Sequence, residues 1–221
     1  AATTWVYEPP AHGEAFAVEA WAVRGPTAIE RRGRATSFDL PEGRFTFLGG
    51  FAADETRSLH DGTLAALHEA ENELRQAGSD FGRIVRTWYY LGQILGRGPQ
   101  EERYQAFNQA RNEFYHDKWP DPVRSPASTG IGMSTRRLAI EAVAWTPASD
   151  SARAVWIDNP LQTPPARYAI PVPTIGKPSF SRAAAIPLGR GALVFVSGTA
   201  SIRGSDVVYP DDVAGQTRVT I

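Results

Sequence analysis

Apolar and polar residues alternate in two early parts of the chain. Within 13–23, Phe16 and Val18 stand among less apolar neighbours, and a similar alternation over 44–48 ends where Gly49 interrupts it. Successive side chains of a strand point to opposite faces, so this spacing is typical of strands that bury one face. We therefore predict two early strands, at 13–23 and 44–48.

A short basic cluster, Arg31, Arg32 and Arg34, lies between these two predicted strands. Such a cluster can face an anionic ligand, but a short run of charge is more often part of a solvated loop. We therefore expect a loop here.

Helical spacing replaces the alternation in two later segments. Leu64, Leu67 and Leu74 recur at helical intervals within 58–76, among good helix formers. The second segment, 101–116, carries one apolar stripe, which consists of Tyr104, Phe107, Ala110 and Phe114. We predict a helix over each segment and expect the first helix to cover one face of a sheet.

Strand chemistry returns on both sides of the second helix. Residues 84–95 are rich in β-branched and aromatic side chains, which favour a strand. Residues 129–133 and 138–145 predict a closing pair of strands joined by 134–137. The predicted order of this part is strand, strand, helix, strand, helix, strand, strand.

A repeated pattern divides the chain into two related modules. The run Phe45-Thr-Phe-Leu-Gly-Gly returns as Val194-Phe-Val-Ser-Gly-Thr, and each copy is an apolar strand that breaks at glycine. We predict a first module over 1–150, a proline-rich connector over 151–179, and the start of a second module over 180–221. The second module appears cut short compared with the first.

The connector and the second module have their own local signals. Six prolines between 158 and 178 exclude a regular helix and disfavour a central strand. Beyond them, 181–186 and 191–196 predict two strands. Asp211 and Asp212 then indicate the opening of a helix.

Composition and charge exclude several classes of partner. The chain has 221 residues, of which 42% are hydrophobic, enough for a sizeable core. Its formal net charge of −1, without long runs of like charge, offers little attraction to nucleic acid or an anionic membrane. The sequence shows neither an apolar stretch of ~18 residues nor a signal-peptide pattern. We expect no nucleic-acid and no membrane partner.

Metal and cofactor motifs are also missing from the sequence. The chain has no cysteine, which excludes disulfides and thiolate metal sites. Its four histidines form no HExxH pattern, although His60 and His68 could lie near one another on the first helix. There is no glycine-rich phosphate loop. We expect no metal and no cofactor.

Several segments resemble modules of the RidA/YjgF superfamily. They are 196–202, followed by 212–217, and Ser125-Pro-Ala-Ser-Thr together with 138–144. The resemblance implies an α+β fold in which a mixed sheet is backed by two helices, and in which three modules assemble around pockets at their interfaces. Imine deaminases of the superfamily carry an arginine after Pro-Ala that holds the substrate carboxylate. Because Ser128 stands there, we do not expect the first module to be an ordinary deaminase.

A narrower resemblance, to the chorismatases, covers most of the chain. It rests on Trp88-Tyr-Tyr-Leu-Gly-Gln-Ile-Leu, 103–115, Pro126-Ala-Ser-Thr-Gly-Ile-Gly-Met and 180–183. The resemblance implies a degenerate first module fused to a RidA-like second one. It also implies hydrolysis of the enolpyruvyl ether of chorismate to pyruvate plus a cyclohexadiene diol or a hydroxybenzoate. We expect a cytoplasmic enzyme of secondary metabolism, either a monomer or a trimer, because chorismate belongs to the shikimate pathway.

The proton donor for this reaction is not identified in the sequence. Hydrolysis of an enol ether needs protonation of the methylene carbon, and a carboxylic acid with a raised pKa suits that role. The resemblance assigns it to a glutamate late in the second module, which we expect beyond Ile221. Two alternatives stay open: a RidA-like imine deaminase or non-catalytic small-ligand binder, and a structural interaction module.

Arginines are the first candidates for substrate binding. Chorismate is a dianion with two carboxylates, and the planar guanidinium binds a carboxylate through two hydrogen bonds. We rank Arg182 first because it follows the connector and, with Tyr168, lies where the two modules would meet. Arg103 and Arg111 are eight residues apart and share roughly one face of the second helix. One of these could enter the pocket.

The alternative for Arg103 and Arg111 is that both are solvated and pair with Glu102 and Glu113.

Among aromatic residues, Tyr90 is our candidate for the cleft, while Tyr89 points to the opposite face of the strand and packs under a helix. The last candidate group follows a buried strand, where a glycine lets backbone amides approach a ligand: Ser197, Gly198, Thr199 and Ala200. The alternative for this group is a tight turn.

Overall fold

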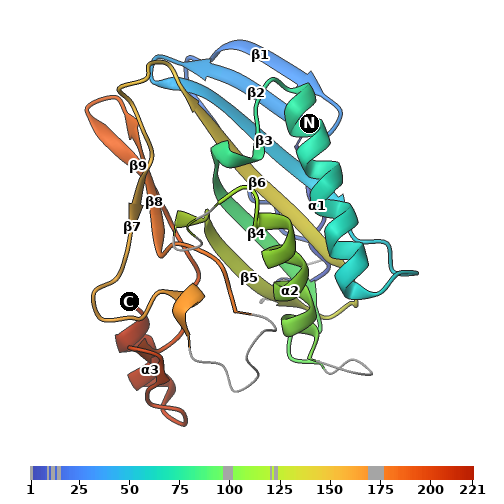
Figure 1. The fold of residues 1–221 in the computed structure, drawn as a ribbon, viewed down its shortest axis with the longest axis vertical. Helices are drawn as coiled ribbons and strands as arrows, with labels where there is room; N and C mark the ends of the chain where they lie inside the picture. Colours follow the sequence, from blue (N-terminus) through green and yellow to red (C-terminus); the bar gives the residue numbers. More distant parts are fainter. Residues whose placement is uncertain are drawn as a thin grey trace.

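A six-stranded mixed sheet with two helices on one face forms the larger part of the computed structural model (Figure 1). The structure describes residues 2–8, 10, 13, 16–96, 102–119, 121, 124–168 and 177–221. In spatial order the strands are β1 (Thr27–Arg32), β2 (Ala35–Leu40), β3 (Gly43–Ala52), β6 (Leu138–Pro147), β4 (Ile84–Gly92) and β5 (Ala127–Met133). Neighbouring strands are antiparallel, except for the parallel pair β4 and β5. The predicted α+β class is confirmed.

The two helices begin and end close to where the sequence predicts. The first helix, α1 (Leu59–Gln76), is capped by Ser58, whose hydroxyl accepts a hydrogen bond from the Asp61 amide at 3.0 Å. The second, α2 (Arg103–Tyr115), lies beside it (Figure 1). Glu101, where we expected this helix to begin, lies outside the described residues.

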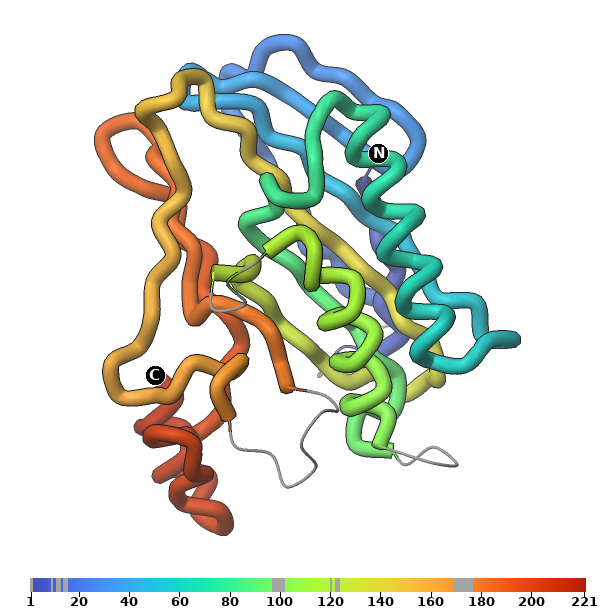
Figure 2. Tube along the Cα trace, in the orientation of Figure 1, coloured from blue at the N-terminus to red at the C-terminus, as the bar shows by residue number. Residues whose placement is uncertain are grey.

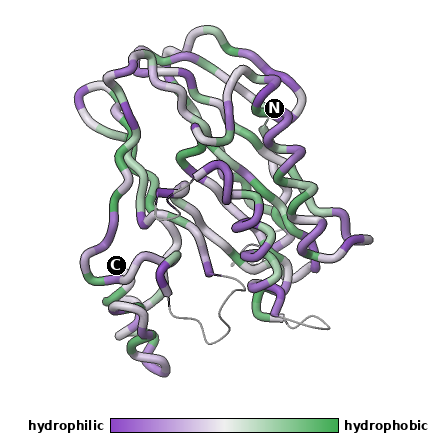
Figure 3. Tube along the Cα trace, viewed as in Figure 1, coloured by the Kyte–Doolittle hydropathy of each residue, from purple (hydrophilic) through white to green (hydrophobic). Residues whose placement is uncertain are grey.

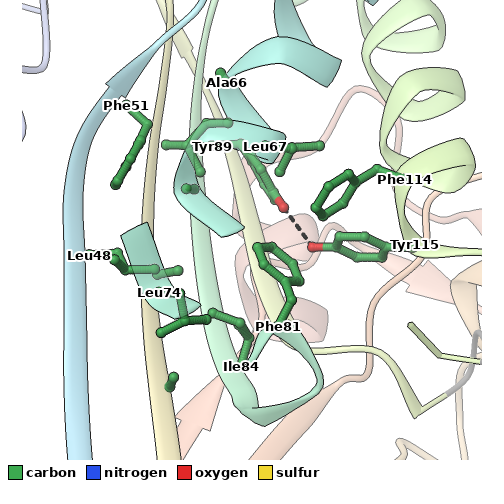
Figure 4. Close-up of a cluster of buried hydrophobic side chains, with 14 of the residues drawn as sticks. Leu48, Phe51, Ala66, Leu67, Leu74, Phe81, Ile84, Tyr89, Phe114 and Tyr115 are labelled. Carbon is green, nitrogen blue, oxygen red and sulfur yellow. Dashed lines mark hydrogen bonds between the residues drawn. The ribbon is translucent and has the colours of Figure 1, made fainter. Parts of the chain in front are cut away.

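The main core lies between these helices and the sheet. It is formed by apolar side chains from β3, β4, β6 and both helices, among them Leu48, Phe51, Leu67, Leu74, Ile84, Phe107 and Phe114 (Figure 4). Leu67 and Leu74 are fully buried, as their helical spacing predicts for residues that face a sheet. Burial of this apolar surface is the main source of stability for the larger unit.

Two tyrosine hydroxyls meet inside this core. The Tyr89 and Tyr115 oxygens are 2.6 Å apart, and both side chains are buried (Figure 4). Burial raises the pKa of both hydroxyls above the ordinary tyrosine value, so they stay protonated and each can donate or accept. Tyr89 therefore packs under α2, where the sequence places it.

Replacing Tyr89 with phenylalanine should lower the free energy of unfolding by about 1–2 kcal/mol, because the buried Tyr115 hydroxyl loses a partner. Urea denaturation measures this change. The double substitution with Tyr115→Phe should cost less than the sum of the single ones, because the two hydroxyls depend on each other. Tyr104→Phe, on a half-buried residue, is the control and should change stability by less than about 0.5 kcal/mol. If the effects of Tyr89→Phe and Tyr115→Phe were additive, the two hydroxyls would not be energetically coupled.

The strand predicted at 13–23 is wrong. The described residues of this segment form no strand and lie on the sheet face opposite the helices, where Trp21 contacts Phe47 and Trp88 (Figure 2). Phe16 and Val18, which carry the alternating pattern, are 76% and 77% exposed, so the pattern does not mark the buried face of a strand here.

The early strands are instead β1 and β2, which form a hairpin. Gly33 makes the turn with a φ of 54°, a conformation that favours glycine. The predicted loop is thus only the turn at Gly33 and Arg34, since Arg31 and Arg32 belong to β1. The Arg34 guanidinium pairs with Glu69 and Glu73 of α1, so this part of the basic cluster is neutralised by the helix.

The predicted closing strands exist but are not neighbours. They correspond to β5 and β6, and β6 lies between β3 and β4, whereas β5 is at the sheet edge. The helix α2 connects β4 to β5, and a helical crossover between strands of one sheet produces parallel pairing. The pairing is thus set by the crossover rather than by the short turn after β5.

A smaller antiparallel sheet follows, ordered β7 (Val155–Ile157), β8 (Ala183–Leu188) and β9 (Gly191–Val196). The two predicted strands of this region are confirmed; β7, an edge strand within the predicted connector, was not predicted. A short two-stranded ribbon follows, formed by β10 (Ile202–Arg203) and β11 (Asp206–Val207). The helix α3 (Val213–Thr220) comes last. Residues 169–176 of the predicted connector lie outside the described residues.

A second core joins the two sheets. Ile186 and Phe195 of the smaller sheet pack with Phe45 and Trp145 on the face of the large sheet opposite the helices. Figure 3 shows hydrophobic residues along the strands of both sheets. None of the helices among the described residues is both long and apolar enough to cross a membrane.

Candidate functional site

The end of β9 docks on the edge strand β5 of the large sheet. The Ser128 amide donates to the Ser197 hydroxyl at 2.8 Å, and the Gly198 amide donates to the Ser128 carbonyl at 3.1 Å. The Ser197 hydroxyl in turn donates to the carbonyl of Ser181. We call the region where these segments meet, with the side chains of Arg182 and Tyr168, the junction. It is held by backbone groups and small hydroxyls, which fix the position of the loop after β9.

Arg182 is buried at this junction and lies beside Tyr168. Its Nη2 donates to the Tyr168 hydroxyl at 2.6 Å and to the Thr163 carbonyl at 2.9 Å. The guanidinium carbon is 5.6 Å from the centre of the Phe180 ring and 5.9 Å from that of Tyr168. No carboxylate among the described residues pairs with Arg182, and its buried Nε has no hydrogen-bond partner there. The structure thus brings together the two residues that the sequence places at the module boundary.

The loop after β9 reaches the same region through Gln162. The Thr199 hydroxyl lies 3.3 Å from the Gln162 side-chain nitrogen, and Gln162 also donates to the Ile202 carbonyl at 3.1 Å. Gln162 precedes Thr163, whose carbonyl binds Arg182. Gly198, Thr199 and Ala200 are exposed, while Ser197 is buried. An exposed loop therefore lies beside a buried arginine, while the Gly198 amide and the Ser197 hydroxyl are already bonded within the junction.

Arg86 is a second buried cation at the junction, and the sequence analysis did not identify it. Its Nη1 donates to the Val196 carbonyl at 3.1 Å and its Nη2 to the Thr129 hydroxyl at 2.6 Å. The guanidinium carbon stands 4.4 Å from the centre of the Trp88 ring. Burial lowers the pKa of Arg86 to about 10, so the side chain still carries its charge at neutral pH. A charged residue inside the apolar run of β4 was the available signal.

Substituting Arg86 with lysine should lower the free energy of unfolding by about 1–2 kcal/mol, because one ammonium group cannot reach both Val196 and Thr129 as the guanidinium fork does. Chemical denaturation measures the effect. Arg83→Lys is the matched control, since Arg83 is half-exposed and forms an exposed ion pair with Asp80; its effect should stay within about 0.5 kcal/mol. Equal effects of the two substitutions would show that Arg86 does not tie the two sheets together.

Tyr90 lies on the same strand and face as Arg86 and Trp88. Its hydroxyl donates to Glu141 of β6 at 3.1 Å, and the side chain is half-buried. Burial and the neighbouring carboxylate raise the pKa of Tyr90, which keeps the phenol protonated. The structure therefore places Tyr90 on the face that the sequence predicts, but its hydroxyl is bonded to Glu141 rather than to a residue of the junction.

Arg103 and Arg111 are not solvated, which corrects the alternative given for them. Arg103, at the N-terminus of α2, donates to the carbonyls of Gly92 at 2.9 Å and Arg136 at 2.8 Å. Arg111 is buried, packs on aromatic rings and donates to Asn108 at 2.6 Å. The hydrogen bonds of both side chains are therefore with other parts of the chain and not with Arg182. Backbone carbonyls and the neutral side chain of Asn108 satisfy these buried guanidinium groups, and a helical pattern in the sequence does not reveal such partners.

Comparisons with known proteins agree with this architecture. A family model described as Chorismatase FkbO/Hyg5-like, N-terminal, matches residues 19–144. A 3-hydroxybenzoate synthase from Streptomyces hygroscopicus is 30% identical over 187 residues, which are 81% of this chain and 52% of that protein. A chorismatase from Streptomyces rapamycinicus is 28% identical over 99% of this chain and 63% of its own length. The chain thus spans about half to two thirds of the length of these curated relatives.

Among solved structures, a chorismatase crystal structure superposes with a TM-score of 0.69 at 24% identity, over 88% of this chain and 56% of that chain. The mixed sheet backed by two helices, with a second sheet docked at its edge, therefore defines a chorismatase-type fold. The family model covers more than half of the residues. The chain belongs to the Chorismatase FkbO/Hyg5-like family, whose N-terminal model matches residues 19–144.

Proposed function

We propose that the junction binds chorismate and that the protein hydrolyses the enolpyruvyl ether of this substrate. The observation that carries the proposal is Arg182, a buried guanidinium with an unpaired Nε and no carboxylate partner among the described residues. A buried arginine without an acid is suited to bind an anion, because the ligand carboxylate can supply the missing charge. The family membership makes chorismate the natural candidate.

The proposed roles follow from the contacts. Arg182 holds one substrate carboxylate, and the Tyr168 hydroxyl orients the guanidinium and can donate to the same anion. The ring of the substrate lies against the exposed loop after β9, Gly198, Thr199 and Ala200, and Ser197 fixes the start of this loop through its bond to Ser181. Arg86 keeps that loop in place through the Val196 carbonyl and adds positive charge nearby. Tyr90 is retained as a more distant part of the proposed site.

The proposed reaction needs acid catalysis and water. Protonation of the methylene carbon gives an oxocarbenium-like centre, water adds to it, and collapse releases pyruvate together with the ring product. When one water is consumed overall, the ring product is a cyclohexadiene diol; a hydroxybenzoate forms when the ring also loses one water molecule, so that this route consumes no net water. The residues named above bind and orient the substrate, and the proton donor is not assigned to any of them. The module boundaries 1–150, 151–179 and 180–221 are part of this proposal, with the site between the first and second modules.

The deaminase alternative is less well supported by the contacts of Ser128. A deaminase would need a cation at this position for its substrate carboxylate, whereas the Ser128 hydroxyl accepts from Thr87 at 3.0 Å and its amide is bound by Ser197. These groups already have partners within the protein. The first module therefore has no carboxylate clamp at Ser128.

The test is to incubate the longest expressed form of the protein with chorismate, quantify pyruvate, and identify the ring product by mass spectrometry. Equal amounts of pyruvate and one ring product support the proposal, and the product mass distinguishes the diol from the hydroxybenzoate. Consumption of chorismate without pyruvate would contradict ether hydrolysis. Ammonia release from imine substrates, with chorismate untouched, would favour the deaminase.

A further inference from the structure

A separate cavity of about 620 Å³ lies on the helix face of the large sheet, between the starts of α1 and α2 and the turn that joins β5 to β6. Figure 1 shows these three segments at the same end of the sheet. The described residues that line the cavity include Ala53, Arg57, His60, Arg103, Gln109 and Arg136. None of the described lining residues belongs to the junction, so this cavity is not part of the site described above.

Two arginines of the cavity lack an acidic partner among the described residues. Arg103 donates to two backbone carbonyls, one of them that of Arg136, and the Arg136 side chain is exposed and forms no ion pair within the described chain. Burial lowers the pKa of Arg103, and the like charge of the neighbouring Arg136 guanidinium lowers it further through repulsion. A bound anion would relieve this repulsion.

The two acids that line the cavity already have arginine partners. Arg57 pairs with Asp54 at 3.6 Å, and Arg137 pairs with Glu55 at 2.6 Å. His60 contacts two carboxylates outside the described lining, at 3.2 Å from Asp61 and 3.1 Å from Glu113. Within the described lining, Arg103 and Arg136 are therefore the arginines without an acidic partner.

The surface between the charged groups is apolar. Ala53, Ala106 and Leu138 line the cavity, and the last two are buried. Gln109 and Ser58 add neutral polar groups at the lining. A ligand that combines an anionic head with a small hydrocarbon body would contact both kinds of surface.

We propose that this cavity binds a small organic carboxylate with an apolar ring or chain, held by Arg136 and Arg103. The two guanidinium groups would bind the carboxylate, and the body of the ligand would rest on Ala53 and Leu59, which line the cavity and are partly exposed. A carboxylate suits the site better than phosphate, because phosphate has no apolar part to cover the alanine and leucine surface. The site does not depend on the proposed chorismate chemistry.

The test uses benzoate as the probe and the whole chain as the protein. A titration followed by amide chemical shifts should give saturable changes at Ser58, His60 and Gln109. Arg136→Gln should weaken benzoate binding about tenfold, the loss expected for one charged hydrogen bond. Arg31→Gln, at an exposed arginine of β1, is the matched control and should leave the affinity unchanged.

Three results would overturn the proposal. The first is benzoate binding that is equally tight in Arg136→Gln, and the second is benzoate binding that shifts only amides of the junction. The third is inorganic phosphate binding as tightly as benzoate to the same amides, which would show that the apolar surface makes no contribution. Thermal unfolding of Arg136→Gln shows whether that variant is folded, and Arg136→Lys, which keeps the charge, should retain part of the affinity.

Discussion

The Arg182→Ala variant is expected to lose at least about 100-fold in kcat/KM for chorismate, measured by pyruvate release. Charge-assisted hydrogen bonds contribute about 1.5–3 kcal/mol each, so loss of a guanidinium that binds a carboxylate through two bonds costs at least about 3 kcal/mol, which corresponds to this fold-change. The substitution also leaves the Tyr168 hydroxyl and the Thr163 carbonyl without the donor that they share in the structure. Both consequences act at the proposed substrate site.

Two further variants separate substrate binding from folding. Arg182→Lys keeps the positive charge but lacks the planar fork, so it should recover only part of the activity. Arg203→Ala removes an exposed arginine of β10 in the same part of the chain and should change kcat/KM by less than about twofold. Thermal unfolding of each variant controls for stability. A folded Arg182→Ala protein with unchanged kcat/KM would contradict the assignment of Arg182.

The Gly92→Ala variant is expected to lose about 3 kcal/mol of unfolding free energy, the upper range for overpacking a tight site. A Cβ built at Gly92 would lie 2.0 Å from the Thr135 carbonyl oxygen and 2.6 Å from the Arg136 carbonyl carbon. These contacts are with backbone atoms, so they cannot be relieved by a side-chain rotation. The turn between β5 and β6 would have to move away from the end of β4.

Gly130→Ala is the matched control for this prediction. A Cβ at Gly130 would meet Tyr104 at 3.7 Å, an ordinary van der Waals distance, and Gly130 lies in the neighbouring strand β5. Its effect should stay below about 1 kcal/mol. Urea denaturation of both variants measures the difference. Similar unfolding free energies for the two proteins would mean that the turn yields easily, which contradicts the close packing described here.

Local sequence patterns predicted the helices well because their signals lie within the helices themselves. The segment 58–76 carries leucines at helical spacing and begins at the capping residue Ser58. The hairpin of β1 and β2 was missed for a related reason. All six residues of β1 are exposed, so this strand has no apolar alternation to detect.

Strand order could not be predicted from local patterns, because pairing depends on the crossover through α2. The order of the strands is therefore a property of the whole sheet.

The site was predictable in part. Arg182 and Tyr168 are expected to lie together because the proline-rich connector brings their segments to the module boundary, and the structure pairs them. The burial of Arg111 depends on Asn108 and two aromatic rings whose arrangement only the fold reveals. Arg86, in contrast, was detectable as a charge within an apolar strand.

The most direct test of the proposed site is a crystal structure of the protein with chorismate or an unreactive analogue bound. The account predicts a ligand carboxylate within hydrogen-bonding distance of the Arg182 guanidinium and the Tyr168 hydroxyl, with the ring against the loop that contains Gly198 and Thr199. A ligand bound only elsewhere, for example beside Arg136 in the helix-face cavity, would contradict the assignment of the junction as the chorismate site.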